Sequence, residues 1–443
     1  MTTPFVREAS RQRVGNVLSH KSAAGIGRLV RRLAQLRGSG TALPGLVVER
    51  LDPGFLAAAL ANLPEGVVVV TGTNGKTTTT KMVVELLRAS GLTVFSNRSG
   101  SNFTRGIIAG MLGELDGHGR LNADIAVLEL DEAHAIQFIR EAPPRYSLLL
   151  NITRDQLDRF GEVDYTASLL EKVARATQVG VVLNRDDPLV SRIGDALADS
   201  VERRYFGAGA SVQHLFPDDS HLYGTRPELT PDASAATRDG DVVLTGLDGK
   251  SATYSFGDVV QPAVELGMDG VHNALNAAAA LSVVRMVLGD RADGAVLCAA
   301  LGSVGPAFGR GESIDVDGSK LEIVLVKNPS GFRLALHSYA TRDAATMIAI
   351  NDRYADGRDT SWLWDVDFSR LSNVAVVSGT RADDMALRLH YDSIDVATVE
   401  GSLSAALDTF LAIEGAKRIY CTYTAMMAIR GILASKFDLA GIQ

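Results

Sequence analysis

The chain has 443 residues, of which 46% are hydrophobic, and its formal net charge is −8. This length predicts about three domains, and an acidic chain without interleaved aromatic and basic residues argues against nucleic-acid binding. The two cysteines, Cys298 and Cys421, are far apart and form no motif, which argues against a disulfide framework and a cysteine-based zinc site. The sequence predicts neither a membrane span nor a signal peptide, so a cytoplasmic protein is expected.

The N-terminal segment is basic, unlike the rest of the chain. Residues 1–38 contain eight basic side chains and one acidic side chain, Glu8. Such a segment predicts an amphipathic helix that lies against anionic lipid at the inner face of the plasma membrane, or a solvated helix that packs on the next domain. The sequence leaves both open. Gly38-Ser39-Gly40 and Pro44-Gly45 are typical of a linker, so residues 1–45 are predicted to be this helical segment and its linker.

A phosphate-binding loop is predicted directly after the first strand. Residues 67–70 are four valines, which predict a buried strand, and residues 81–88 have helical apolar spacing. Between them lies Gly-Thr-Asn-Gly-Lys-Thr, whose backbone N–H groups would surround an anion at a helix N-terminus. Lys76 would neutralise nucleotide phosphates, and the Thr77 hydroxyl would bind Mg²⁺. The strict pattern requires glycine where Val70 stands; the alternative is a strand–turn–helix junction with an incidental Lys-Thr.

The region after this loop predicts an α/β ATP-binding domain over residues 46–304. Apolar strands alternate with helices, which indicates a doubly wound parallel sheet covered on both faces. The predicted strands are residues 92–95, 124–130, 146–152 and 180–184. Residues 203–262 are rich in Asp, Gly, Ser, Thr and Pro, which predicts β-hairpins on the edge of this domain. A helix over residues 271–288 closes the region.

A second, smaller Rossmann-like α/β domain is predicted over residues 305–443. Residues 302–311 are glycine-rich and predict a hinge. The strands predicted beyond it are residues 321–326, 345–350, 374–378 and 418–421.

Polar side chains stand at the carboxyl ends of the predicted strands, where open α/β sheets bind ligands. Glu129 ends one strand and could hold Mg²⁺ opposite Thr77, whereas Asp131 or Glu132 could cap the next helix. Residues 151–161 follow another strand and contain six polar side chains that could position nucleotide, metal or substrate.

The order of these motifs resembles the Mur ligases. It includes the loop, Glu129–Glu132, Asn151–Gly161, Leu183–Pro188 and His272–Ala277. Three further stretches narrow the resemblance to the MurT family, the synthetase subunits of lipid II isoglutaminyl synthase: Lys327–Gly331, Asn351–Trp362 and Ser378–Ala382. Gln156 stands where ordinary Mur ligases carry histidine, as in MurT proteins. Several MurT proteins carry a four-cysteine zinc ribbon, but residues 203–262 contain no cysteine, so no zinc is expected.

This resemblance implies ATP-dependent amidation of the α-carboxyl of D-glutamate in the lipid II stem peptide. An acyl phosphate would form first, and ammonia from a GatD-type glutaminase in a heterodimer would displace phosphate. Mg²⁺ would be held by Thr77 and Glu129, and Lys76 and Arg310 would act on the phosphates. The implied ATP-binding residues are Gly72, Thr73, Asn74, Gly75, Lys76, Thr77, Thr78, Asn273, Asn276, Arg310 and Asn328.

Asp359 is the third implied catalytic residue. By resemblance it would complete a Cys-His pair of the partner subunit across the interface. The alternatives are that Asp359 caps the helix beginning at Thr360, or that Asp356 has the interfacial role. Lys172 falls where some Mur ligases carry a carbamylated lysine, although a solvated helical lysine fits the sequence as well.

Two other functions are alternatives for a chain with these motifs. An amino-acid-adding ligase of the Mur or folylpolyglutamate type would need the same phosphate-binding loop. A silent scaffold that only docks a glutaminase would not need Lys76, Thr77 and Glu129 together.

Overall fold

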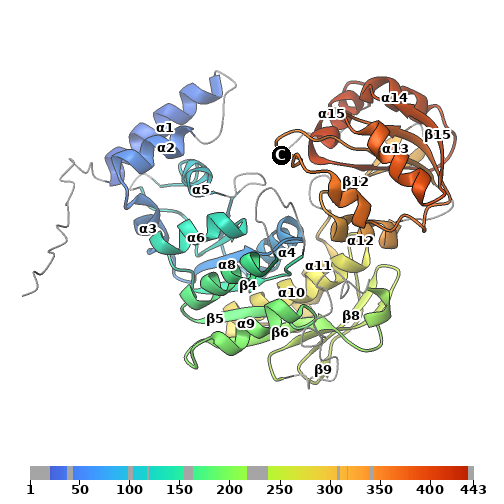
Figure 1. Ribbon diagram of the computed structural model, residues 1–443. Helices are drawn as coiled ribbons and strands as arrows, with labels where there is room; N and C mark the ends of the chain where they lie inside the picture. Colours follow the sequence, from blue (N-terminus) through green and yellow to red (C-terminus); the bar gives the residue numbers. More distant parts are fainter. Residues whose placement is uncertain are drawn as a thin grey trace, which may run out of the picture.

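The computed structural model describes residues 20–36, 43–97, 103–116, 119–153, 163–216, 238–306, 310–316, 318–339 and 344–437. For residues 33–36 and 310–312 it describes the backbone alone. Figure 1 shows two α/β units, with the elements from α1 to α11 at the left and the bottom and the last third of the chain at the upper right.

The first unit is built on a ten-stranded sheet with the order β10-β8-β7-β6-β5-β4-β1-β3-β2, and β9 pairs with β8. The pairs from β2 through β7 are parallel, and β8 is antiparallel to its neighbours β7, β9 and β10. The strands are β1 (Gly66–Thr71), β2 (Val94–Ser96), β3 (Ile125–Glu129), β4 (Tyr146–Leu149), β5 (Gly180–Asn184), β6 (Glu202–Ala208), β7 (Val242–Asp248), β8 (Ser251–Phe256), β9 (Val259–Val260) and β10 (Val264–Glu265).

Helices cover both faces of this sheet. On β1, Val68 and Val70 join one hydrophobic cluster with α4 and α10, whereas Val67 and Val69 join another with α2, α3, α5 and α6. This double burial explains the unbroken run of valines. The helices are α1 (His20–Leu36), α2 (Leu43–Leu51), α3 (Phe55–Leu60), α4 (Lys76–Ala89), α5 (Thr104–Met111), α6 (Glu132–Glu141), α8 (Val163–Ala176), α9 (Pro188–Ile193), α10 (Val271–Leu288) and α11 (Gly294–Gly302).

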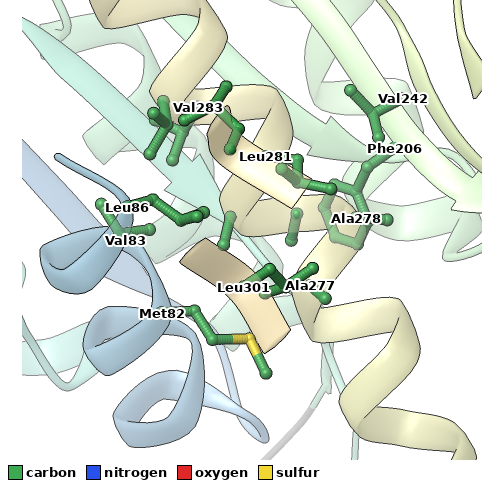
Figure 2. Packing of buried hydrophobic residues seen from close by; sticks show 14 of the residues in the cluster. Met82, Val83, Leu86, Phe206, Val242, Ala277, Ala278, Leu281, Val283 and Leu301 are labelled. Carbon is green, nitrogen blue, oxygen red and sulfur yellow. The ribbon is translucent and has the colours of Figure 1, made fainter. Parts of the chain in front are cut away.

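Helix α10 is the centre of the larger core. Figure 2 shows Ala277, Ala278 and Leu281 of α10 among side chains from α4, α11, β6 and β7. Within the described ranges, one helix is long and apolar enough by composition to cross a membrane, Val271–Arg291, and 72% of its apolar window is buried inside the protein. The sequence analysis did not anticipate this helix as a candidate span. Its apolar side chains are explained by their burial in the core of the first unit.

The second unit is a six-stranded sheet with the order β11-β12-β16-β13-β14-β15, in which only the β11–β12 pair is antiparallel. Helix α12 and α13 pack on one face and α14 and α15 on the other. The elements are β11 (Arg310–Val316), β12 (Ser319–Leu325), α12 (Pro329–Tyr339), β13 (Ala345–Ala349), η6 (Ser361–Asp365), β14 (Asn373–Ser378), α13 (Ala382–Tyr391), β15 (Asp395–Glu400), α14 (Leu403–Leu411), β16 (Lys417–Cys421) and α15 (Tyr423–Ala434).

The α/β class and the parallel sheet are confirmed, with three differences from the sequence-based expectation. Pro44 and Gly45 lie in the first turn of α2 instead of a linker, because Gly45 packs so closely on α5 that a Cβ there would lie 1.9 Å from the backbone oxygen of Arg105. Strand β6 is parallel to β5 and extends the main sheet before the hairpin begins. Strands β11 and β15 were not predicted from the sequence; β15 alternates exposed and half-buried residues, as an edge strand does.

The phosphate-binding loop follows β1, at the point where the strand order reverses. Strand β1 has β4 on one side and β3 on the other, so the chain crosses the sheet between them. This is the position at which α/β sheets bind ligands beyond their carboxyl ends.

Replacing Leu281 by Ala tests the packing around α10. Leu281 is fully buried, so Leu281→Ala removes apolar contacts and leaves a cavity. The free energy of unfolding of the first unit should fall by about 2–5 kcal/mol. Urea denaturation followed by circular dichroism measures this change. Val259→Ala, at an exposed position on β9, is the control and should change stability by less than about 0.5 kcal/mol.

Candidate functional site

The loop between β1 and α4 contains two glycines that the structure requires. Gly72 and Gly75 have φ values of 130° and 85°, which side-chain-bearing residues rarely adopt. A Cβ at Gly75 would also lie 2.6 Å from Oδ1 of Asn276 on α10. The loop can therefore turn into α4 and approach α10 only with glycine at position 75, and its backbone stays accessible to an anion at the start of α4.

Asn74 is held by contacts from the end of the neighbouring strand. Its backbone N–H donates to Oδ1 of Asn151 over 2.8 Å, and Nδ2 of Asn151 donates back to its backbone oxygen over 3.0 Å. Nδ2 of Asn74 donates to the hydroxyl of Thr153 over 3.0 Å. Residues 154–162, which include Gln156, lie outside the described residues. The described part of the predicted polar stretch thus fixes the loop's shape.

The edge of the sheet beyond Asn151 is fixed by two further side chains. Nδ2 of Asn184 donates to the backbone oxygen of Leu150 over 2.8 Å, and Oδ2 of Asp187 accepts from the N–H of Ile152 over 2.6 Å. Burial raises the pKa of Asp187 to about 6, although backbone N–H donors oppose this shift. Both residues belong to the Leu183–Pro188 motif, and in the structure they support the segment that holds the loop.

Lys76 begins α4 and is buried together with its ammonium group. Nζ donates to the backbone oxygen of Gly72 over 2.6 Å. It also lies 3.3 Å from Oδ1 of Asp131 and 3.8 Å from Oε2 of Glu132. Asp131 is at the N-cap position of α6, but its side chain makes no capping hydrogen bond there. The two carboxylates therefore balance a cation that lies against the backbone of the loop.

Thr77 and Glu129 form an oxygen pair suited to Mg²⁺. The Thr77 hydroxyl donates to Oε1 of Glu129 over 2.9 Å. Asn97, directly after β2, exchanges two hydrogen bonds with the backbone of Glu129 and fixes this residue. Mg²⁺ commonly takes one or two protein oxygens and completes its shell with water and phosphate oxygens, so the donor set fits. Across the described residues, no group of three or more His, Cys, Asp or Glu side chains could hold a metal ion.

The second unit reaches the same loop through Asn328. Its Nδ2 donates to Oδ1 of Asn74 over 3.0 Å, and its Oδ1 accepts from the N–H of Gly331 in the first turn of α12. Asn328 is fully buried between the two units. A pocket of about 910 Å³, open to solvent, lies along this contact. It is lined by Asn74, Gly75, Thr78, Asn151, Phe216, His272, Leu275, Asn276, Val324, Leu325, Lys327, Gly331, Leu334, Ala335 and Tyr339.

The structure brings most of the predicted nucleotide-binding residues to this pocket or to the loop beside it. Asn276 lines the pocket, whereas Asn273 donates to the backbone oxygen of Asp269 and is not among the lining residues. The side chain of Arg310 lies outside the described atoms. Lys172 is exposed on α8, so the solvated alternative describes it. Asn97 was missed; it lies two residues beyond the predicted strand 92–95 and directly after β2 in the structure.

The two candidate aspartates of the second unit have different surroundings. Asp356 is buried, and its carboxylate accepts from the N–H of Arg353 and from both the N–H and the hydroxyl of Thr424 in the first turn of α15. Asp359 is partly exposed, and its Oδ1 accepts from the N–H of Ser361 over 2.8 Å at the start of η6. Asp356 therefore anchors the loop, whereas Asp359 has the predicted capping contact and remains accessible. Its interfacial role stays a prediction.

Neither cysteine is placed for nucleophilic catalysis. Cys298 on α11 and Cys421 on β16 are both buried and unpaired by disulfide. Burial raises the pKa of both thiols, and a thiol rather than a thiolate is a poor nucleophile.

Comparison with known proteins shows two family matches within the chain. Residues 70–284 match the Mur ligase middle domain, and residues 325–426 match the MurT ligase C-terminal domain. These segments contain the loop between β1 and α4 and the contact of Asn328, respectively.

Curated relatives match over most of their length. The chain is 31% identical over 431 residues to the MurT subunit of lipid II isoglutaminyl synthase (glutamine-hydrolyzing) from Streptococcus pneumoniae, covering 90% of this chain and 93% of that protein. It is 29% identical to the Staphylococcus aureus subunit of the same name, covering 85% and 89%. Among solved structures, the MurF ligase of Thermotoga maritima in complex with ADP has a TM-score of 0.64 at 17% identity, covering 98% of this chain and 88% of that one.

The buried thiols make a direct chemical prediction. Because both sulfurs are enclosed and their pKa values are raised, neither should react with Ellman's reagent in the native protein within minutes. Two thiols per chain should react once guanidinium unfolds the protein. A native thiol that reacts at once would contradict the described burial.

The two aspartates predict opposite effects on stability. Asp356→Ala removes a buried carboxylate and leaves the partly buried N–H groups of Arg353 and Thr424 without this acceptor, so the free energy of unfolding should fall by about 1–3 kcal/mol. Asp359→Ala removes the exposed hydrogen bond to the N–H of Ser361 and should cost less than about 1 kcal/mol. Thermal unfolding of both variants measures the difference. Equal losses would mean that the loop is not anchored through Asp356.

Proposed function

The chain belongs to the MurT family, and from this premise we propose that it is the synthetase subunit of a lipid II isoglutaminyl synthase. The reaction would convert the α-carboxyl of D-glutamate in the lipid II stem peptide into the amide of D-isoglutamine, with ATP as energy source, on the cytoplasmic side of the membrane. One observation carries the proposal. It is the likeness to a MurT subunit over 90% of the chain. The hydrogen bonds of Lys76 with Gly72 and of Thr77 with Glu129 support a role of these residues in phosphoryl transfer.

The proposed chemistry has two steps. The γ-phosphoryl group of ATP passes to a carboxylate oxygen of the substrate, which gives ADP and an acyl phosphate. Ammonia then attacks the carbonyl carbon, the carbon–oxygen bond to phosphate breaks, and the nitrogen loses a proton to the departing phosphate or to water. The protein's part in the first step is to hold the phosphates in line and to neutralise their charge.

Lys76 supports this first step through its position. Its ammonium is already balanced by Asp131 and Glu132, so phosphate oxygens would exchange with these carboxylates at little change in burial. Mg²⁺, held by Thr77 and Glu129, would supply further positive charge on the phosphates. The adenine end of the nucleotide fits the pocket between α10 and α12, where Asn276 and His272 offer polar groups beside apolar Leu275 and Leu334.

A separate subunit is the proposed source of ammonia. The two cysteines are buried, so hydrolysis of glutamine by a thiolate would have to occur on a partner of the GatD type. The accessible carboxylate of Asp359 could orient a histidine of that partner. Trp364 of η6 and Leu387 and Tyr391 of α13 are large exposed side chains on elements next to this loop, and the rings of Trp364 and Tyr391 are 5.2 Å apart. Such a surface suits a protein partner.

An amidation assay on lipid II tests the proposal. The chain with ATP and Mg²⁺ should amidate lipid II when supplied with ammonium, or with glutamine and the partner subunit. Asp359→Asn should keep the ammonium-dependent rate within about twofold and lower the glutamine-dependent rate by about 10²–10⁴-fold. Asp383→Asn, an exposed carboxylate on α13, is the matched control and should change neither rate. Mass spectrometry of the stem peptide measures the product.

Each alternative function gives a different outcome in this assay. Lys76→Met should abolish product with both nitrogen sources, because the phosphates lose their buried cation. If no condition amidates lipid II but a free amino acid is ligated, the chain is an amino-acid-adding ligase of the Mur or folylpolyglutamate type. If the wild type never hydrolyses ATP while it still binds a glutaminase, it is a scaffold.

A further inference from the structure

Helix α1 packs on the first unit through its small residues. Ala23, Ala24 and Gly27 are buried against α2 and the end of α5. A Cβ on Gly27 would lie 2.5 Å from Cγ2 of Val48 and 2.9 Å from Cδ1 of Leu112. The approach is therefore so close that a side chain larger than that of glycine does not fit at position 27.

Two large apolar residues of α1, Ile26 and Leu29, point the other way. Ile26 and Leu29 are 39% and 60% exposed, and Lys21 and Arg32 are exposed as well. At 100° per residue these four positions share one side of the helix, with the two cations along one flank of the apolar pair. A helix that only packs on its own domain buries its large apolar residues, so this orientation is the reverse of the usual one.

One cation on the inward side, Arg28, is already used within the protein. Nη2 of Arg28 donates to the backbone oxygens of Leu115 and Asp116 over 2.7 and 2.9 Å, beyond the C-terminal end of α5. The carboxylates near this helix also have partners, since Asp52 pairs with His20 and Glu49 pairs with Arg105. Arg28 thus fixes α1 on the first unit, and Lys21 and Arg32 leave the outward flank of α1 positively charged.

Charge indicates what could cover the outward face. Residues 1–38 have a net charge of +7, whereas the remaining residues have a net charge of −15. An acidic body is repelled by an anionic bilayer, but its basic N-terminal end is attracted to one. Figure 1 shows α1 beside α2 at one end of the first unit, away from the second unit, so this end can approach a flat surface.

We propose that the outward face of α1, formed by Lys21, Ile26, Leu29 and Arg32, docks on the surface of an anionic phospholipid bilayer. Ile26 and Leu29 would enter the boundary between headgroups and acyl chains, and Lys21 and Arg32 would lie among the phosphates. Docking goes beyond the proposed reaction. If that reaction is correct, a lipid-linked substrate would meet the chain in the plane of the bilayer.

Vesicle flotation of the full chain tests this docking without any substrate. The wild type should bind vesicles of phosphatidylcholine with one third phosphatidylglycerol, bind phosphatidylcholine alone at least about tenfold more weakly, and be released by high salt. The double variant Ile26→Glu with Leu29→Glu should bind the anionic vesicles at least about tenfold more weakly. Val259→Glu with Val260→Glu, at exposed positions on β9, is the matched control and should bind as the wild type does.

Three outcomes would overturn the docking proposal. They are equal binding of wild type and the α1 variant, equal binding to neutral and anionic vesicles, and no binding at all. Circular dichroism and ammonium-dependent amidation in detergent must be unchanged in the variant. These controls show that the variant has lost its docking surface and not its fold. If the variant instead fails to assemble with the partner subunit or with a second copy, the outward face is a protein interface. Loss of amidation with intact flotation would count against the proposed reaction alone.

Discussion

The hydrogen bonds of Asn74 are the constraint on which the site depends. Asn151 after β4 holds the backbone of Asn74, and Asn328 from the second unit binds its side chain. One residue of the loop is thereby fixed by two sheets that are far apart in sequence. The loop is therefore held from within the first unit, and the Asn328 hydrogen bond connects it to the second unit.

The parts of the site divide their roles by location. The groups proposed to bind phosphate and metal lie at one edge of the first sheet, because its parallel strands end there and β1 lies where the order reverses. The second sheet supplies Asn328 and the wall of the pocket from α12. Further along the second unit, Asp356 fixes the loop that carries Asp359, while Trp364 and Tyr391 are exposed beside it. The proposed ATP-dependent step and the proposed partner surface therefore lie at different places on the chain.

At three places in the structure a glycine allows two elements to approach each other closely. Gly75 lets the loop approach α10, Gly45 lets α2 approach α5, and Gly27 lets α1 approach α2. In the last case the consequence extends to the surface, because a helix that packs by its small residues must turn Ile26 and Leu29 outward. Packing density thus determines which part of the basic N-terminal segment is presented to the surroundings.

The sequence by itself determined the local elements and the chemistry of the loop. Four valines, two glycines and Lys-Thr in order predict strand, turn and helix from backbone sterics alone, and the burial of α10 matches its continuous apolar run. The sequence did not reveal Asn97, the structural role of Asp356 or strand β15, because each depends on neighbours remote in the chain. Only the tertiary structure decided which of Asn273 and Asn276 faces the pocket and which side of α1 is exposed. A sequence gives the spacing of side chains along a helix, whereas contacts with the rest of the fold decide which side faces inward.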